Sequence, residues 1–515
     1  MLKSIFVLCP SLLICFSILA QVPEDALRLS FTHPSGTARE QAIGGAMGSL
    51  GGDLSANFVN PAGLGFYKVG ELLFTPSYSF SGSNASYLLN NSKGGSTNQF
   101  NVSTSGLVYA EVNSPGNSNA FSIAVTRSAD FNGHTFYKGN NNYSSATEAY
   151  VSEFESSGLS VNDALSSPNL TYGTRSALYT YLIDTSMGGL GPVISQPGKV
   201  LAAGGSLQQS TDIISSGGIT ELAFSVAGGI HDKWYWGGSV GVPILSYKHT
   251  VTYTETDNGA NPNNDFSTYS YTEYYSASGA AFNFKLGGIF RPNLNWRFGL
   301  AVHTPSIWGI TDKLSTKMVT NTEGYHGIDS INSAPLDQAS NTSNTINYDV
   351  EGPWHFLVSG SYIFPGTQVE GKMGFITADI EYVTYTSPNF YFPLDDNGNS
   401  PDNSYYDPLN KAIKASYKNN FNFRLGGEYK VDELAFRLGG SYSMNPYSSA
   451  DLKGSYSTIS GGVGYRKKGI FIDLTYVELI KKDVNFPYRL TDKENVYATT
   501  RQNTGSIILT MGFKF

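Results

Sequence analysis

Cysteine is nearly absent from this chain, and both cysteines lie in a part that we expect to be removed. Cys9 and Cys15 fall within the apolar stretch 5–19, which follows a lysine and ends at a small residue. This arrangement is typical of a secretory signal peptide, so we expect cleavage after residues 1–20. A lipid anchor on Cys15 is the alternative, but the bulky Ile14 before it disfavours that processing. The mature chain would then have no disulfide, thiol nucleophile or thiolate metal site.

Charged residues are scarce as well. Asp, Glu, Lys and Arg make up 14% of the chain, against about 25% in ordinary soluble domains. The composition therefore disfavours a soluble enzyme. The net charge of −8 excludes the broad basic surface expected of a nucleic-acid-binding protein.

Long apolar runs are absent after residue 20, and none approaches the ~20 residues that a transmembrane helix needs. A chain that spans lipid without helices has to close a sheet on itself, because each backbone polar group needs a partner inside the bilayer. The chain instead contains 56 glycines, 34 tyrosines and 30 phenylalanines, and many short alternating segments. We therefore predict an all-β fold, an antiparallel transmembrane β-barrel.

The C-terminal segment 505–515 gives the clearest strand signal. Apolar and polar side chains alternate along it, which is the apolar-out, polar-in pattern of a barrel strand. The predicted outward face comprises Ile507, Leu509, Met511, Phe513 and Phe515. The last strand of a soluble sandwich is the alternative, which the composition and the signal peptide disfavour. A strand that ends on Phe515 also resembles the signal read by the outer-membrane assembly machinery.

Similar segments recur upstream, and we count about fourteen strands between Gly70 and Phe515, an even number as in bacterial single-chain barrels. Their predicted outward faces include Trp296, Phe298, Leu300, Val302, Phe421, Phe423, Leu425, Tyr429, Phe436, Leu438, Tyr442, Ile459, Val463, Tyr465, Ile470, Ile472, Leu474 and Tyr476. Short turns alternate with long polar connections, which predicts a periplasmic end that holds both chain termini and an outer end that holds the loops. The predicted long connections are 82–100, 130–218, 257–268, 321–344, 387–415, 445–456 and 484–502.

The longest of these connections, 130–218, contains two candidate helices. They cover residues 146–155 and a segment that begins at Ser160, which is a suitable N-cap. A connection of this length is seldom structureless in a compact fold. We therefore expect an ordered cap with some helix at the outer end.

Residues 21–69 precede the first predicted strand and are rich in glycine and alanine. A floppy periplasmic tail is one interpretation, but the segment is too apolar and too low in charge for a typical disordered tail. Glycine permits tight turns and close approach of two backbones. We predict that this segment folds inside the lumen as a plug, and that residues 70–515 form the barrel.

These segments together resemble the FadL/TodX family of outer-membrane transporters for long-chain fatty acids and other hydrophobic compounds. Residues 120–132 are similar to the family's third strand, and 424–429 and 436–446 to its paired strands near the C-terminal third. The positions similar to the family's N-terminal plug are Gly44, Gly45, Asp53, Asn60, Pro61 and Ala62.

The resemblance implies a monomer in the Gram-negative outer membrane. It implies capture of a hydrophobic small molecule by the outer loops, passage to a lumenal pocket, plug rearrangement, and exit into the bilayer through a gap beside the kinked third strand. The positions of this chain that match the kink are Thr126, Arg127, Ser128 and Ala129. The implied surroundings are the lipid bilayer and lipopolysaccharide.

A fatty-acid carboxylate would need a lumenal cation as its partner. The alternation turns Arg297, Arg424, Arg437 and Arg466 inward, and Arg424 and Arg437 lie in segments that match the family. Pairing with Asp or Glu across the lumen is the favoured alternative, because buried charges are usually paired.

Other chemistry is thinly represented. The histidines show no metal-ligand spacing, and no Gly-x-Ser-x-Gly nucleophile elbow stands out. Residues 395–402 weakly resemble a calcium loop, but a plain Asn/Asp-rich turn is favoured. We therefore expect no metal, no cofactor and no enzymatic activity. The alternative functions are an adhesin or structural barrel that acts through its loops and, less favoured, a lipid-modifying enzyme.

Overall fold

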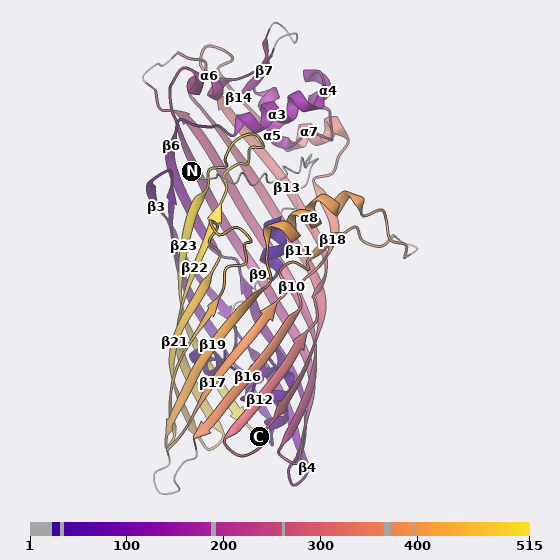
Figure 1. Ribbon diagram of the computed structural model, residues 1–515, viewed down its shortest axis with the longest axis vertical. Coiled ribbons are helices and arrows are strands. Elements are labelled where there is room, and N and C mark those ends of the chain that lie inside the picture. Colours follow the sequence, from indigo (N-terminus) through magenta and orange to yellow (C-terminus); the bar gives the residue numbers. More distant parts are fainter. Residues whose placement is uncertain (1–22, 31–34, 187–191, 260–262, 365–371, 396–397) are drawn as a thin grey trace, which may run out of the picture.

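The computed structural model describes residues 23–30, 35–186, 192–259, 263–364, 372–395 and 398–515 (Figure 1). The predicted signal peptide lies outside these residues. Within the described ranges, no helix is long and apolar enough to cross a membrane.

Fourteen antiparallel strands form a closed barrel, as predicted, whose long axis is vertical in Figure 1. The last strand, β23, pairs with β1 and β2 at the start of the barrel, which closes the sheet. Several strands are interrupted and carry two labels. In chain order the strands are β1 and β2 (Glu71–Phe74, Pro76–Tyr87), β3 and β4 (Asn90–Val102, Ser105–Ser114), β5 and β6 (Asn117–Asp130, Gly133–Asn141), β9 (Leu207–Ile230), β10 (Trp234–Asp257), β11 (Thr268–Phe290), β12 and β13 (Trp296–His303, Ile307–Asn321), β15 and β16 (Thr345–Glu351, His355–Phe364), β17 and β18 (Lys372–Val383, Asn389–Tyr391), β19 (Asn420–Val431), β20 (Leu434–Ser443), β21 (Tyr456–Lys467), β22 (Ile470–Asn485) and β23 (Ala498–Lys514).

The faces of the strands follow the predicted alternation. On β20, Phe436 and Leu438 are exposed, whereas Arg437 between them is buried. The same holds on β23, where Met511 and Phe513 are exposed and Thr510 is buried. Exposed apolar side chains cover the lower and middle outer wall, which is the surface that a lipid bilayer requires.

The connections distinguish the two ends of the barrel. Tight turns join the strands at the lower end, where the C-terminus lies, and most helices gather at the upper end (Figure 1). The elements of the upper connections are β7 (Ile183–Thr185), β8 (Val193–Ser195), β14 (Ile328–Asn332), α3 (Thr147–Ser157), α4 (Val161–Leu165), α5 (Tyr172–Tyr179), α6 (Gln196–Ala202), α7 (Ser333–Ser340), η4 (Ser404–Tyr406) and α8 (Asp407–Ser416).

The predicted cap of the outer end is confirmed. Helices α3 and α4 occupy the two segments expected to be helical, and the Ser160 side chain accepts a hydrogen bond from the Asp163 amide as the N-cap of α4. The fully buried Arg175 on α5 donates to the Leu336 carbonyl of α7 at 3.2 Å and so joins two of the cap helices.

Two of the predicted connections are wrong. Residues 82–100 form most of the β2–β3 hairpin, which turns at Leu88 and Leu89, both in the left-handed region (φ 47° and 64°). The connection predicted at 130–218 is shorter, because β6 continues the third strand to Asn141 and β9 already begins at Leu207. These strand portions lack the regular apolar face, since they extend above the apolar band; Ala85, Tyr87 and Tyr137 instead pack together between β2 and β6.

The N-terminal segment lies inside the barrel. It forms α1 (Pro23–Ser30), α2 (Ala38–Ala42) and the short 3₁₀ helices η1 (Leu54–Asn57) and η2 (Pro61–Phe66) before it enters β1. The Ala38 amide donates to Thr510 Oγ1 of β23 at 2.8 Å, and Thr475 Oγ1 of β22 donates to the Ala38 carbonyl at 2.6 Å.

Glycines of the wall make room for this segment. A Cβ added to Gly439 would lie 2.1 Å from the carbonyl carbon of Ile43, and one added to Gly426 would lie 2.2 Å from the Ile43 oxygen. Gly44 has φ +67°, and a Cβ added to it would lie 2.5 Å from the Gly440 nitrogen. The plug and the wall are therefore in backbone contact, which only glycine permits.

Candidate functional site

The residues that suggested a plug make the bonds that hold its turns together. Thr37 Oγ1 donates to the Asp53 carboxylate at 2.9 Å, and Asp53 Oδ1 accepts from the Ser55 amide as the N-cap of η1. Asn60 caps η2 in the same way, and its Nδ2 donates to the Gly48 carbonyl at 2.6 Å. Pro61 and Ala62 form the first turn of η2. The motif is thus a set of capped turns, whose fixed shape fits the wall.

Two of the predicted lumenal arginines belong to an ionic cluster beside the plug. Arg437 Nε lies 2.6 Å from Glu428 Oε2, and its Nη1 lies 2.6 Å from Asp473 Oδ1. Arg466 Nη2 lies 3.5 Å from the same Asp473. Arg39 of the plug reaches Glu428 at 3.7 Å. We term these five side chains the anchor cluster, because they connect the plug to β19, β20, β21 and β22.

The other two predicted arginines are also engaged by protein groups. Arg297 donates to the Leu50 carbonyl of the plug, and its guanidinium lies 4.5 Å from the centre of the Phe66 ring. Arg424 Nη2 lies 2.5 Å from Glu381 Oε2. Of the four predicted arginines, Arg424 is the one that lines a cavity described below.

A small cavity of about 130 Å³ lies above the plug and is lined by Glu40 and Val59 from the plug and by Arg424 from the wall. Two pairs of ionisable side chains line it: Lys285 Nζ contacts Glu221 Oε1, and His355 Nδ1 lies 2.9 Å from Glu381 Oε1. The prediction missed Lys285. The alternation of Phe284 and Leu286 on the outer face with Lys285 on the inner one is the signal that could have identified it.

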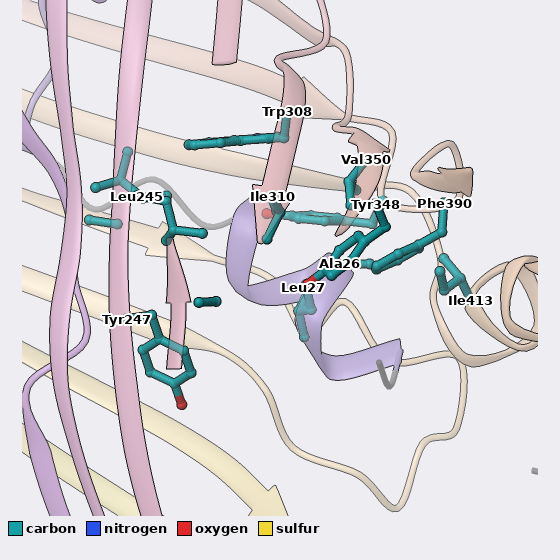
Figure 2. Close-up of a cluster of buried hydrophobic side chains, with 14 of the residues drawn as sticks. Ala26, Leu27, Leu245, Tyr247, Trp308, Ile310, Tyr348, Val350, Phe390 and Ile413 are labelled. Atoms are coloured by element: carbon teal, nitrogen blue, oxygen red, sulfur yellow. The ribbon is translucent and has the colours of Figure 1, made fainter. Parts of the chain in front are cut away.

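The helix α1 occupies the upper lumen, surrounded by apolar side chains (Figure 2). Ala26 and Leu27 point from α1 toward aromatic and aliphatic residues of four wall strands and α8. The labelled partners are Leu245, Tyr247, Trp308, Ile310, Tyr348, Val350, Phe390 and Ile413. We term this surrounding set the apolar collar. The Arg28 guanidinium stacks 4.3 Å above the Tyr247 ring, so the charged end of α1 also rests on an aromatic surface.

A larger cavity of about 400 Å³ extends from α1 to the wall. Leu27 and Arg28 line it from α1, and Arg127, Ala129 and Phe131 line it from the third strand. It therefore connects the apolar collar with the strand that the resemblance marks as kinked.

The wall lacks a ladder beside this cavity. Strands β4 and β5 pair as far as Ser105 and Val125; above that point β5 and β6 pair with β9 and β3 pairs with β2. Within the described part of the chain, no ladder joins β3 to β5 or β6. Instead, β6 packs on the inner face of the β2–β3 hairpin, where the Tyr137 and Tyr87 ring centroids are 5.1 Å apart. We term this unpaired stretch the wall gap.

All four residues predicted for the kink lie at the lower end of the wall gap. The register of β5 against β9 shifts between Arg127 and Ala129, so Ser128 is the extra residue of a β-bulge. Arg127 Nη1 donates to Thr220 Oγ1 at 3.3 Å, and Thr126 Oγ1 lies 2.9 Å from Thr104 Oγ1 across the gap. A bulge bends the strand that carries it, and above this one the third strand pairs, among the described residues, with β9 alone.

Side chains that the prediction missed bridge the gap higher up. Asn101 Nδ2 of β3 donates to Asp130 Oδ2 of the third strand at 2.9 Å, and Ser83 Oγ of β2 donates to the His134 carbonyl of β6 at 2.6 Å. A few side-chain hydrogen bonds thus replace the backbone ladder. Such bonds are weaker in sum than a ladder, because they are fewer and a hydrogen bond of either kind contributes about 0.5–1.5 kcal/mol net.

Among the described residues, no group of three or more His, Cys, Asp or Glu side chains is placed to hold a metal ion.

No family model and no curated protein matches this sequence. Solved structures do match the fold. A Pseudomonas aeruginosa FadL homologue matches with a TM-score of 0.54 and 15% identity, over 94% of this chain and 100% of that one. The Pseudomonas putida toluene transporter TodX matches with a TM-score of 0.50 and 13% identity, over 94% of this chain and 100% of that one. The fold is therefore the FadL/TodX-type barrel, as the sequence resemblance predicted.

Proposed function

We propose that this FadL/TodX-type barrel lies in the outer membrane, takes up small hydrophobic molecules and releases them sideways into the bilayer. The observation that carries the proposal is the wall gap, which adjoins a cavity of about 400 Å³ and has no backbone ladder among the described residues. The fold adds support, because the similar structures include a toluene transporter and a FadL homologue.

The proposed route passes the apolar collar. A hydrophobic molecule that enters from the outer end gains free energy when it exchanges water for the collar, at roughly 25 cal/mol per Å² of apolar surface buried. Helix α1 already occupies the collar, so the ligand has to displace it or share the space. From there the larger cavity leads to the wall gap without passage through the plug, and the anchor cluster keeps the remainder of the plug in place.

The ligand class follows from the charges along this route. Arg424 and Lys285 already have carboxylate partners, so a fatty-acid carboxylate would have to compete with Glu381 or Glu221 for them. A neutral apolar compound needs no such exchange. We therefore place neutral apolar compounds first and long-chain fatty acids second among the candidate ligands.

The ligand class is tested with the intact barrel, purified in a mild detergent. Co-purified small molecules are identified by mass spectrometry, and binding of a fatty acid is compared with that of the alcohol of equal chain length. Equal or tighter binding of the alcohol, unaffected by Arg424→Gln, is the expected result. A strong preference for the acid that Arg424→Gln abolishes would instead identify a carboxylate site. A barrel that binds neither compound would refute the proposed function.

The exit route is tested by a reversible crosslink across the wall gap. The described residues contain no cysteine, so Asn101→Cys with Asp130→Cys introduces a unique pair at two positions whose side chains are in contact. Ser441→Cys with Thr458→Cys is the matched control, because these hydroxyls are 2.7 Å apart across an intact ladder. A short bifunctional thiol reagent serves where a disulfide does not form.

Uptake of the compound that binds is then measured in cells under oxidising and reducing conditions. We expect the gap crosslink to reduce uptake and a reductant to restore it, whereas the control pair has no effect. Uptake that persists through a fully crosslinked gap would refute sideways exit at this place.

A further inference from the structure

A basic pocket of about 580 Å³ lies on the outer wall near the upper rim, away from the lumen. Four cationic side chains line it: Lys93 of β3, Lys482 of β22, Arg501 of β23, and Lys453 of the connection between β20 and β21. None of the four belongs to an ion pair within 4.0 Å among the residues that the structure describes. Asp483, the acid in the lining, is engaged by Lys481 and by the Tyr447 hydroxyl, both at 3.0 Å.

The strand register places three of these cations in one row. Lys482 pairs directly with Arg501, Arg501 pairs with Asn84, and Asn84 pairs with Lys93. The row thus crosses four adjacent strands without an acidic side chain. Like charges directly opposite each other in a sheet are destabilising. An anion bound from outside the protein would neutralise these positive charges and so explain why the row keeps them side by side.

The depth of the row identifies where that anion resides. Below it, Phe80 and Tyr476 point outward with ring centroids 6.5 Å apart, and both cover Gly505 of β23. Outward aromatic side chains mark the membrane–water interface of a barrel. Arg501 lies four residues above Gly505, about 13 Å along the strand, which is roughly 10 Å along the membrane normal at the usual strand tilt. The row therefore lies in the headgroup layer of the outer leaflet.

We propose that this pocket binds the phosphate groups of a phosphorylated glycolipid of the outer leaflet, such as the lipid A part of lipopolysaccharide. Lysine and arginine form short, charge-assisted hydrogen bonds to phosphate oxygens, and arginine can donate two in parallel. Asn84, Ser86 and Thr499 in the lining provide donors and acceptors for sugar hydroxyls. The pocket lies outside the lumen, so this proposal does not depend on which compound the barrel transports.

The test measures binding of lipid A to the intact purified barrel in detergent by native mass spectrometry. The probes are phosphorylated lipid A, enzymatically dephosphorylated lipid A and inorganic phosphate. The variant is Lys482→Gln with Arg501→Gln. The matched control is Lys467→Gln with Lys468→Gln, which removes the same charge from the turn at the opposite end of the barrel. Heat-modifiable gel mobility verifies that each variant is folded.

We expect phosphorylated lipid A to bind the intact barrel and to bind the row variant about tenfold more weakly or worse, since two charge-assisted contacts are lost. The turn control should bind like the unmodified barrel, and dephosphorylated lipid A should bind weakly to all three. Equal binding by the row variant, or equal binding of dephosphorylated lipid A, would overturn the proposal. Inorganic phosphate that binds as tightly as the lipid would show that the site takes free phosphate and would overturn the lipid assignment.

Discussion

Replacement of Arg437 by methionine tests whether the anchor cluster holds the plug to the wall. The Arg437 side chain is 1% exposed and bridges two carboxylates, Glu428 and Asp473, at 2.6 Å each. Its removal leaves two acids with reduced compensation in a buried site. The loss of one partner of a buried ion pair typically costs about 3–5 kcal/mol, so we expect a loss of that order in the free energy of unfolding.

The assay is equilibrium unfolding by urea in detergent micelles, with protease sensitivity of residues 35–70 as a second readout. The matched control is Lys467→Met, which removes an ion pair between Lys467 and Glu433 whose side chains are 53% and 45% exposed. An exposed pair contributes little to stability, so this variant should unfold like the unmodified barrel.

A second variant separates charge from shape. Arg437→Met combined with Asp473→Asn removes one uncompensated acid, and we expect it to regain part of the stability that Arg437→Met loses. The reasoning is refuted if Arg437→Met is no more destabilising than Lys467→Met, or if the double variant shows the simple sum of its two losses.

Three further predictions concern the plug, the collar and the cap. Gly439→Ala should cost about 1–3 kcal/mol and expose the plug to protease, because its Cβ would collide with plug backbone; Gly360→Ala, where nothing lies within 4 Å, should leave protection unchanged in the same digestion. Leu27→Asp should expel α1 from the apolar collar and so increase the fluorescence of an environment-sensitive apolar dye that binds there. The control Glu24→Gln alters only a part-exposed ion pair and should leave the dye fluorescence unchanged. Equal dye signals from the two variants would contradict the idea that α1 fills the collar. Arg175→Met should leave the Leu336 carbonyl without its donor, so limited digestion should cleave the cap faster while the urea unfolding of the barrel stays unchanged. Unchanged digestion of the cap, or a shift in barrel unfolding, would contradict this prediction.

The barrel could be predicted because lipid imposes a period of two on the sequence. On β20, Phe436, Leu438 and Tyr442 face outward as expected, with Arg437 and Ser441 between them. The pattern fails where lipid ends. The upper parts of β2 and β3 have water on one side and β6 on the other, so neither face meets lipid and the alternation is lost. The β2–β3 turn also lacks the Asn-Gly or Asp-Gly signal of a tight hairpin, since it uses Leu88 and Leu89.

The candidate site was predictable in part. Inward-facing arginines follow from the alternation, but the alternation says nothing about depth along the barrel. Arg437 and Arg424 differ in their position along the barrel axis. Arg437 therefore contacts acids beside the plug, whereas Arg424 lines a cavity above it. The bridge between Asn101 and Asp130 escaped prediction for a related reason, because these residues are far apart in sequence and meet only where the ladder is missing.

The bonds between the plug and the last two strands have a consequence for assembly. Segment 35–70 leads directly into β1, and Ala38 is bonded to Thr475 of β22 and to Thr510 of β23. The first strand of the barrel is therefore tethered beside its last one by the segment that fills the lumen. This tether shortens the loop that the seam must close, which lowers the entropic cost of closure. The folded plug thus favours closure of the barrel at the seam, because it contacts the last strand and leads directly into the first one.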